Sequence, residues 1–168
     1  MSTEPLEKVV GRLLTEQKQT IALAESCTGG LVAHRLTNVP GSSSYFIGGV
    51  VSYANEAKER MLGVSHRMLQ EHGAVSEETA REMARRVRRR LQTDVALAVT
   101  GIAGPSGGTP EKPVGLTYIA LAAKDLERCE RYLWQGDRSA NKEQSAEAAL
   151  GMLREYLEAR QAPGATKG

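Results

Sequence analysis

The chain has 168 residues and a formal net charge of +2, with 17 glycines and an aromatic content of only 4%. This length is enough for one domain with a buried core, and the small charge and few aromatic side chains exclude a strongly basic or base-stacking nucleic-acid module. With no apolar run of roughly 18 residues, no signal-peptide pattern and only two cysteines, we expect a cytoplasmic protein without a membrane partner or a disulfide framework.

Apolar spacing and turn residues predict alternating helices and strands in the first half of the chain. In order, the expected elements are a helix from Leu6, a strand over 20–25, a helix over 30–38, a strand over 46–53, a helix over 55–62 and a short helix over 68–71. Asn55 is the expected N-cap of the helix over 55–62. Gly48 and Gly49 predict a bulge or a close backbone approach in the second strand.

The second half continues the alternation and ends in a helix. The expected elements are a helix capped by Ser76, a strand over 94–100, an irregular loop over 101–113, strands over 114–123 and 128–134 that form a hairpin, a helix capped by Ser139 and a frayed tail over 161–168. Strands that alternate with helices, without an internal linker, predict a single α/β domain over residues 1–160.

One segment carries a local excess of positive charge: Arg85, Arg86, Arg88, Arg89 and Arg90. The apolar residues around them recur with helical spacing, so most of these arginines fall on the opposite face of the helix. This pattern favours a solvated face over a phosphate-binding patch.

The segment 25–30 (ESCTGG) follows a predicted buried strand and opens a helix. A sharp turn at this place presents the Ser26 hydroxyl to solvent beside backbone N–H groups, which suits a nucleophile or an oxyanion site. The alternative is that Ser26 or Thr28 only caps the helix. Cys27 is a rival nucleophile at the same turn.

A serine nucleophile requires a base, and the three histidines lie away from the predicted strand ends. Lys58 is the other option, because it lies about one turn into the helix that follows Tyr53. It would act only if burial lowers its pKa, and an exposed helical lysine is the alternative. Prolines after Gly101 exclude a dinucleotide fingerprint, and no metal-ligand spacing is present, so we expect neither cofactor nor metal.

Several motifs in order carry a family resemblance. They are AESCTGG (24–30), PGSSSYFIGGVVSYANEAK (40–58), LGV (62–64), HGAVSE (72–77), VTGIAGPSGGTPEKPVG (99–115) and GDR (136–138). From about Thr20 to Tyr156 the chain resembles the CinA C-terminal domain family, which includes the nicotinamide mononucleotide deamidases.

The resemblance implies a three-layer α/β/α fold around a mixed, mainly parallel sheet of about five strands. It also implies hydrolysis of nicotinamide mononucleotide to nicotinic acid mononucleotide and ammonia, in a homodimer or larger homo-oligomer. The implied catalytic residues are Ser26 as nucleophile, Lys58 as general base and Tyr53 as a hydroxyl that completes the group. The expected substrate-binding residues are Thr28, Gly29, Gly30, Ser43, Asn55, Thr100, Gly101 and Arg138, with Arg138 as a cation for the phosphate.

Two hypotheses from different classes follow. The first is a nucleotide amidohydrolase, with a small-molecule nucleotide as its partner and no nucleic acid. The second is a non-catalytic interaction module linked to competence or the DNA damage response, which would use the arginine-rich helix. Ten of the 17 glycines fall in or beside the motif segments, which suggests backbone kept free of side chains for a ligand.

Overall fold

A five-stranded sheet with the order β2-β1-β3-β4-β5 forms the centre of the molecule. The computed structural model describes residues 4–161. The strands are β1 (Ile21–Glu25), β2 (Phe46–Val51), β3 (Val95–Gly101), β4 (Leu116–Ala123) and β5 (Glu127–Leu133). β1 pairs in parallel with β2 and β3, whereas β4 pairs antiparallel with β3 and β5. Only β4 therefore runs against the other four strands, which confirms the expected mixed, mainly parallel sheet.

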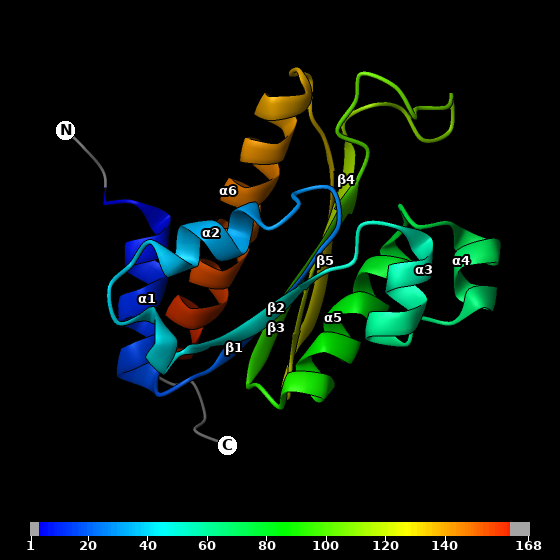
Figure 1. Cartoon of the computed structure of the whole chain (residues 1–168). Coiled ribbons are helices and arrows are strands. Elements are labelled where there is room, and N and C mark those ends of the chain that lie inside the picture. Colours follow the sequence, from blue (N-terminus) through cyan, green and yellow to red (C-terminus); the bar gives the residue numbers. More distant parts are fainter. Residues whose placement is uncertain (1–3, 162–168) are drawn as a thin grey trace.

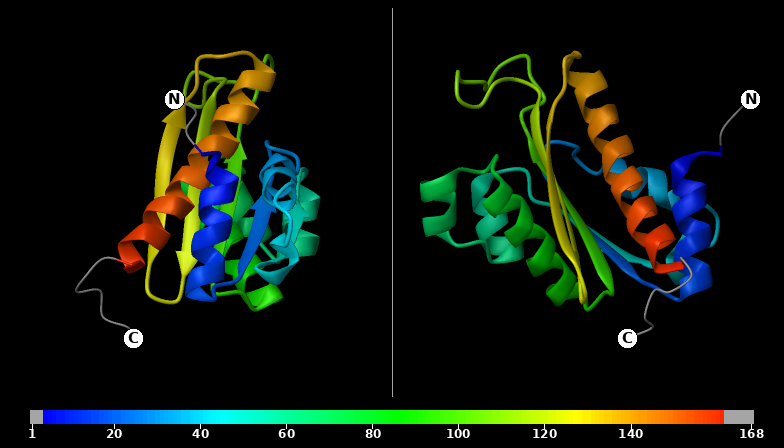
Figure 2. Two further views of the ribbon diagram at one scale, coloured as in Figure 1. Left: turned by 90° about the vertical axis from the view of Figure 1, so that its left-hand side faces the viewer. Right: turned by 180° about the vertical axis from the view of Figure 1, so that it is seen from behind.

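Helices cover both faces of this sheet (Figures 1 and 2). On one face lie α1 (Leu6–Gln17), α2 (Leu31–Thr37) and α6 (Arg138–Gln161), and on the other lie α3 (Asn55–Ala57), the π-helical turn η2 (Lys58–Leu62), α4 (His66–His72) and α5 (Glu77–Leu91). A short 3-10 turn, η1 (Ser42–Ser44), precedes β2. The fold is thus the expected three-layer α/β/α arrangement. Within residues 4–161 no helix is both long and apolar enough to span a membrane.

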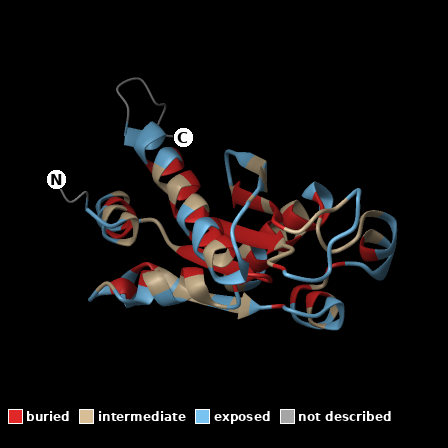
Figure 3. Ribbon diagram, turned by 90° about the horizontal axis from the view of Figure 1, so that it is seen from above, coloured by how far each residue is buried: buried red, intermediate tan, exposed pale blue. Residues whose placement is uncertain are grey.

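The two central strands are buried on both faces, as Figure 3 shows in red. In β3, Val95, Leu97 and Val99 belong to the apolar cluster under α1, α2 and α6. Ala96 and Ala98 point the other way, into the cluster under α5. Because successive side chains of a strand alternate between faces, this pattern sets bulky residues against one helical layer and small residues against the other. The small residues let α5 lie close to the sheet.

The strands and the hairpin formed by β4 and β5 occur where the sequence predicts them. The predicted bulge in β2 is also present, since the partners of Ile21 and Ala22 are Phe46 and Gly48, which leaves Ile47 as the extra residue. Ser76 caps α5 as expected and accepts a hydrogen bond from the Thr79 amide at 3.2 Å. The predicted strands, the bulge in β2 and the Ser76 cap are therefore confirmed.

Two cap predictions are wrong. Asn55 is the first residue of α3, and Ala54 occupies the N-cap position without a side-chain hydrogen bond. Ser139 lies inside α6, and the cap is Asp137, whose Oδ1 accepts a hydrogen bond from the Ala140 amide at 2.9 Å. Relative to the predicted caps, α3 starts one residue earlier and α6 starts two residues earlier.

The tail predicted over 161–168 falls mostly outside the described residues. Gln161 is the last residue of α6, and residues 162–168 are not described.

A buried carboxylate holds the segment that follows β1. Glu25 is 2% exposed, and its side chain accepts hydrogen bonds from the Val32 amide at 2.9 Å, the Ala33 amide at 3.0 Å and the Thr28 hydroxyl at 2.6 Å. Val32 and Ala33 lie in the first turn of α2, whose first amides have no partner within the helix. Glu25 therefore fixes the start of α2 against the end of β1, and with it the turn that contains Ser26.

We expect Glu25→Ala to lower the free energy of unfolding by about 2–4 kcal/mol, because it leaves two buried donors and one partly buried donor without an acceptor. Urea unfolding followed by circular dichroism measures this change. Glu25→Gln is the matched control, since its amide oxygen keeps one acceptor at the same place, and it should lose clearly less. Equal stability of Glu25→Ala and the unchanged protein would contradict the role of Glu25 as a cap.

Candidate active site

A pocket of about 220 Å³ opens at the carboxyl ends of β1, β2 and β3. Its lining residues are Ser26, Cys27, Tyr53, Lys58, Ala74, Val75, Thr100, Gly101, Ala103 and Arg138. We call it the reaction pocket. Ligands of open α/β sheets bind at this edge, because the loops that follow parallel strands meet there. The structure thus brings together six of the residues expected at the site: Ser26, Tyr53, Lys58, Thr100, Gly101 and Arg138.

The central contact joins Ser26 and Lys58. The Lys58 Nζ donates a hydrogen bond to Ser26 Oγ at 2.8 Å, and its other acceptors are the carbonyl oxygens of Ser52 at 2.8 Å and Tyr53 at 3.2 Å. Lys58 is only 1% exposed, so it is not the solvated helical lysine of the alternative interpretation. Its backbone begins η2, where the Gly63 amide reaches back five residues to the Lys58 carbonyl. Such π turns are frequent at functional sites.

Burial lowers the pKa of Lys58 from 10.5 to about 8, because the charged form loses its hydration. About a tenth of the side chains are then neutral at pH 7. A neutral amine has two N–H donors and one lone pair. The carbonyls of Ser52 and Tyr53 can only accept, whereas the Ser26 hydroxyl can also donate. The neutral amine therefore directs its lone pair at the Ser26 hydroxyl, which is the arrangement that a general base requires.

Cys27 is a poor rival for the nucleophile. It is 7% exposed, and burial raises the pKa of its thiol to about 12. The thiolate is the reactive form of cysteine, and at pH 7 it is almost absent at such a pKa. The geometry and the chemistry of the turn both favour Ser26.

Tyr53 contributes differently from the expectation. Its backbone carbonyl accepts from Lys58, but its side chain is 57% exposed, and its hydroxyl accepts a hydrogen bond from Arg138 Nη2 at 2.8 Å. Arg138 Nη1 donates to the carbonyl of Gly104 at 2.7 Å. The Tyr53 hydroxyl is therefore linked to α6 and to the loop after β3 rather than to the Ser26–Lys58 pair.

Thr100 and Gly101 form the β3 side of the reaction pocket. The Thr100 hydroxyl donates to the carbonyl of Ala74 at 2.8 Å, which ties the strand end to the segment before α5. A Cβ on Gly101 would lie 2.6 Å from Thr117 Oγ1 and 2.9 Å from the Leu116 carbonyl oxygen. Gly101 is thus required for packing against β4.

Five expected substrate-binding residues do not line the reaction pocket. Thr28 is buried and bonded to Glu25, while Gly29 and Gly30 form the turn into α2 with φ values of +62° and +104°. Asn55 is exposed at the start of α3. Ser43 lies in η1, before β2, and therefore at the opposite end of that strand from the pocket.

Sequence reasoning missed two contributions to the site. Glu25 was visible as a charged residue at the end of an apolar run, which is a signal for a buried carboxylate with a structural partner. The carbonyl of Ser52 carries no sequence signal, because it is a backbone group and any residue at this position would supply the same oxygen.

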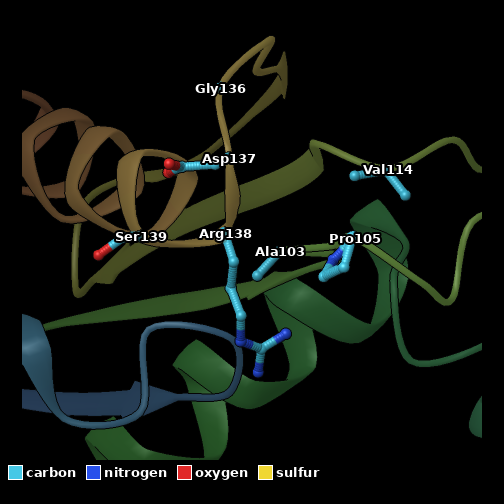
Figure 4. Close-up of a pocket in the computed structure, with 7 residues that line it drawn as sticks. All are labelled: Ala103, Pro105, Val114, Gly136, Asp137, Arg138 and Ser139. Carbon is cyan, nitrogen blue, oxygen red and sulfur yellow. The ribbon is translucent and has the colours of Figure 1, made fainter.

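A second pocket of about 590 Å³ adjoins the first, and we call it the outer pocket (Figure 4). It is lined by Ala103, Pro105, Val114, Gly136, Asp137, Arg138 and Ser139. Ala103 and Arg138 line both pockets, so the two are continuous at these residues. The reaction pocket therefore has room beside it for the parts of a substrate that do not react.

The glycines of the loop after β3 have a different role from the expected one. A Cβ on Gly104 or Gly108 would collide with Val114, and one on Gly115 would collide with the carbonyl of Trp134. Gly104 and Gly115 also have positive φ values of 89° and 93°. These glycines allow the loop to pack on itself and on β5, so the interpretation that they keep backbone free for a ligand is wrong for them.

Comparisons with known proteins agree with this fold. The CinA C-terminal domain family matches residues 3–157. The CinA-like protein of Desulforapulum autotrophicum is 55% identical over 153 residues, which cover 90% of this chain and 36% of that protein. The CinA-like protein of Syntrophus aciditrophicus is 53% identical over 161 residues, which cover 95% of this chain and 38% of that protein. The chain thus spans less than two fifths of the length of these relatives.

A solved structure extends the agreement to three dimensions. The competence/damage inducible protein CihA of Agrobacterium tumefaciens superposes with a TM-score of 0.86 at 39% identity, over 94% of this chain and 99% of that one. Sequence and structure give the same assignment, and the chain belongs to the CinA C-terminal domain family.

Proposed function

We propose that this protein is an amidohydrolase that converts nicotinamide mononucleotide to nicotinic acid mononucleotide and ammonia, in pyridine nucleotide salvage. The observation that carries the proposal is the buried amine of Lys58, 2.8 Å from the Ser26 hydroxyl and with a lowered pKa. This pair supports acyl transfer by a serine nucleophile. The choice of the nicotinamide nucleotide rests on the resemblance to the deamidases of the family.

In the proposed mechanism, neutral Lys58 takes the proton of Ser26 while Oγ attacks the carboxamide carbon. The tetrahedral intermediate collapses, the Lys58 ammonium gives its proton to the leaving nitrogen, and ammonia departs from an acyl-Ser26 ester. Water then attacks the ester carbon, with Lys58 again as the base. The ester bond breaks, Ser26 regains its proton and the carboxylic acid is released.

The oxyanion of the intermediate needs N–H donors that are not already used. The Ser26 amide donates to the Val99 carbonyl at 2.9 Å, and the Ile102 amide donates to the Leu116 carbonyl at 2.9 Å, so both are occupied. Within residues 4–161 the amides of Cys27 and Thr28 donate to no protein acceptor. We assign the oxyanion to these two amides, each worth about 3 kcal/mol in comparable sites.

The interaction-module hypothesis has weaker support. Its arginine-rich helix is α5, where Arg85 pairs with Glu127 at 2.7 Å and Arg86 pairs with Glu82 at 2.6 Å. These ion pairs satisfy part of the charge that would have to contact phosphates. Salt-sensitive DNA binding that is lost when the arginines of α5 are neutralised, without ammonia release from nicotinamide mononucleotide, would reverse this ranking.

We expect Ser26→Ala to reduce ammonia release from nicotinamide mononucleotide by at least about 10³-fold, because it removes the nucleophile. Cys27→Ala is the matched control at the neighbouring position and should keep most of the activity. An enzyme-coupled ammonia assay with purified variants measures both. Turnover retained in Ser26→Ala, or lost only in Cys27→Ala, would refute the assignment of the nucleophile.

The activity should rise with pH as Lys58 loses its proton. With a pKa of about 8, kcat/KM at pH 6 should be about 100-fold below its plateau above pH 9. Lys58→Arg keeps the positive charge but cannot deprotonate in this range, so it should be inactive throughout. A kcat/KM that is flat from pH 5 to pH 9 would count against Lys58 as the base.

The same lowered pKa links folding to pH. Between about pH 8 and pH 10.5 the unfolded chain binds a proton at residue 58 that the folded chain does not bind, so this residue's contribution to stability rises with pH across that window. The free energy of unfolding of the unchanged protein, measured with urea, should therefore increase relative to that of Lys58→Met as the pH rises over this range. A difference that is independent of pH would show that the buried amine keeps an ordinary pKa.

A further inference from the structure

We propose that Lys142 of α6 binds the phosphate group of the substrate. Arg138 is instead a positioning residue that holds Tyr53 and the loop after β3. The proposal rests on the proposed function, because the phosphate belongs to the nucleotide. It changes the assignment implied by the resemblance, in which Arg138 is the cation for the phosphate. Lys142 is not among the residues expected from the sequence.

Lys142 lies one helical turn after Arg138, so both side chains emerge from the same face of α6. Its Nζ lies 3.7 Å from the place where a Cβ on Gly29 would be, and the Gly29 amide donates to the Ser26 carbonyl at 3.0 Å. The ammonium thus lies against the turn that presents the nucleophile. Gly29, an expected substrate-binding residue, thus lies next to Lys142.

Residue 142 is half-buried as a whole, and within residues 4–161 its ammonium makes neither a hydrogen bond nor an ion pair. Its nearest acidic neighbour along α6, Glu143, is exposed, and the carboxylate of Glu25 is already engaged by three donors. A cation without a counter-ion in the protein can bind an anion without first breaking an ion pair. All three donors of Lys142 are available for the oxygens of a phosphate monoester.

Arg138 is placed differently. Both of its terminal nitrogens donate to neutral oxygens, the Gly104 carbonyl and the Tyr53 hydroxyl, at 2.7 and 2.8 Å. These bonds join α6, the loop after β3 and the segment after β2 at the point where the two pockets meet. A guanidinium held in this way fixes the shape of the reaction pocket, which is the role of a positioning residue.

The outer pocket does not suit a phosphate dianion. Its guanidinium, that of Arg138, already donates to the Gly104 carbonyl and the Tyr53 hydroxyl. The pocket also contains the carboxylate of Asp137, and the apolar side chains of Ala103, Pro105 and Val114 form much of its wall (Figure 4). A dianion there would be repelled by Asp137 and would lose hydration against the apolar wall. Beside the Ser26 turn, the ammonium of Lys142 offers a cation that makes no ion pair within residues 4–161.

The test compares kcat/KM for nicotinamide mononucleotide with kcat/KM for the nucleoside, nicotinamide riboside, which lacks the phosphate. Lys142→Met should lower the value for the nucleotide by about 10- to 100-fold, mainly through KM, and change the value for the nucleoside by less than about threefold. Lys142→Arg should keep most of the preference for the nucleotide. Arg138→Met should lower both values to a similar extent.

Lys124→Met is the control for loss of a positive charge, because Lys124 is exposed in the turn between β4 and β5, at the other end of the sheet. It should leave the preference for the nucleotide unchanged. The proposal is overturned if Lys142→Met lowers both substrates equally or neither, or if Arg138→Met removes the preference for the nucleotide alone.

A binding measurement separates this proposal from the proposed function. Calorimetric titration with ribose 5-phosphate should give binding to the unchanged protein that is at least about tenfold weaker in Lys142→Met, whether or not any amide is hydrolysed. If the unchanged protein hydrolyses neither substrate, the proposed function fails, and this titration alone decides the role of Lys142. Equal affinity of the two proteins, or no binding to either, overturns the proposal.

Discussion

The burial of the Lys58 amine is the constraint on which the site depends. An amine without solvent must find acceptors in the protein, and here they come from the end of β1, as Ser26 Oγ, and from the segment after β2, as the carbonyls of Ser52 and Tyr53. The ends of β1 and β2 and the start of η2 must therefore lie at fixed places for the amine to have its hydrogen-bond acceptors. The same lack of solvent lowers the pKa of Lys58. The burial of Lys58 thus explains both the fixed positions of its hydrogen-bond acceptors and its ability to act as a base.

Around this pair, the fold uses charged groups to hold loops at the carboxyl edge of the sheet. Glu25 binds the start of α2, and Arg138 links α6 to the loop after β3 and to Tyr53. The bonds of Glu25 and the bond of Arg138 to the Gly104 carbonyl are partly or wholly removed from water, where such bonds are stronger than on the surface. The apolar layers place the strands, and these polar contacts determine where the strand ends present their side chains.

The sequence predicts the sheet and the positions of Ser26 and Lys58 because these depend on local patterns: an apolar run, a glycine turn and the spacing of a helix. The role of the Tyr53 hydroxyl and the requirement for glycine at position 104 could not be predicted in this way. Each depends on a partner distant in sequence, such as Arg138 for Tyr53 or Val114 for Gly104. The high glycine content is therefore partly a requirement of loop packing, which composition alone does not distinguish from ligand access.

The π-helical turn restricts how this part of the chain can diverge. In η2 the Lys58 carbonyl accepts from the Gly63 and Val64 amides, while Leu62 and Val64 are anchored in the core under α5. Loss of one residue between Lys58 and Leu62 would convert the wide turn to an α-helical one and rotate Lys58 by about 100° relative to those anchors. Substitutions in this stretch leave the geometry of the amine intact, but insertions and deletions do not. Its length, more than its composition, is under constraint.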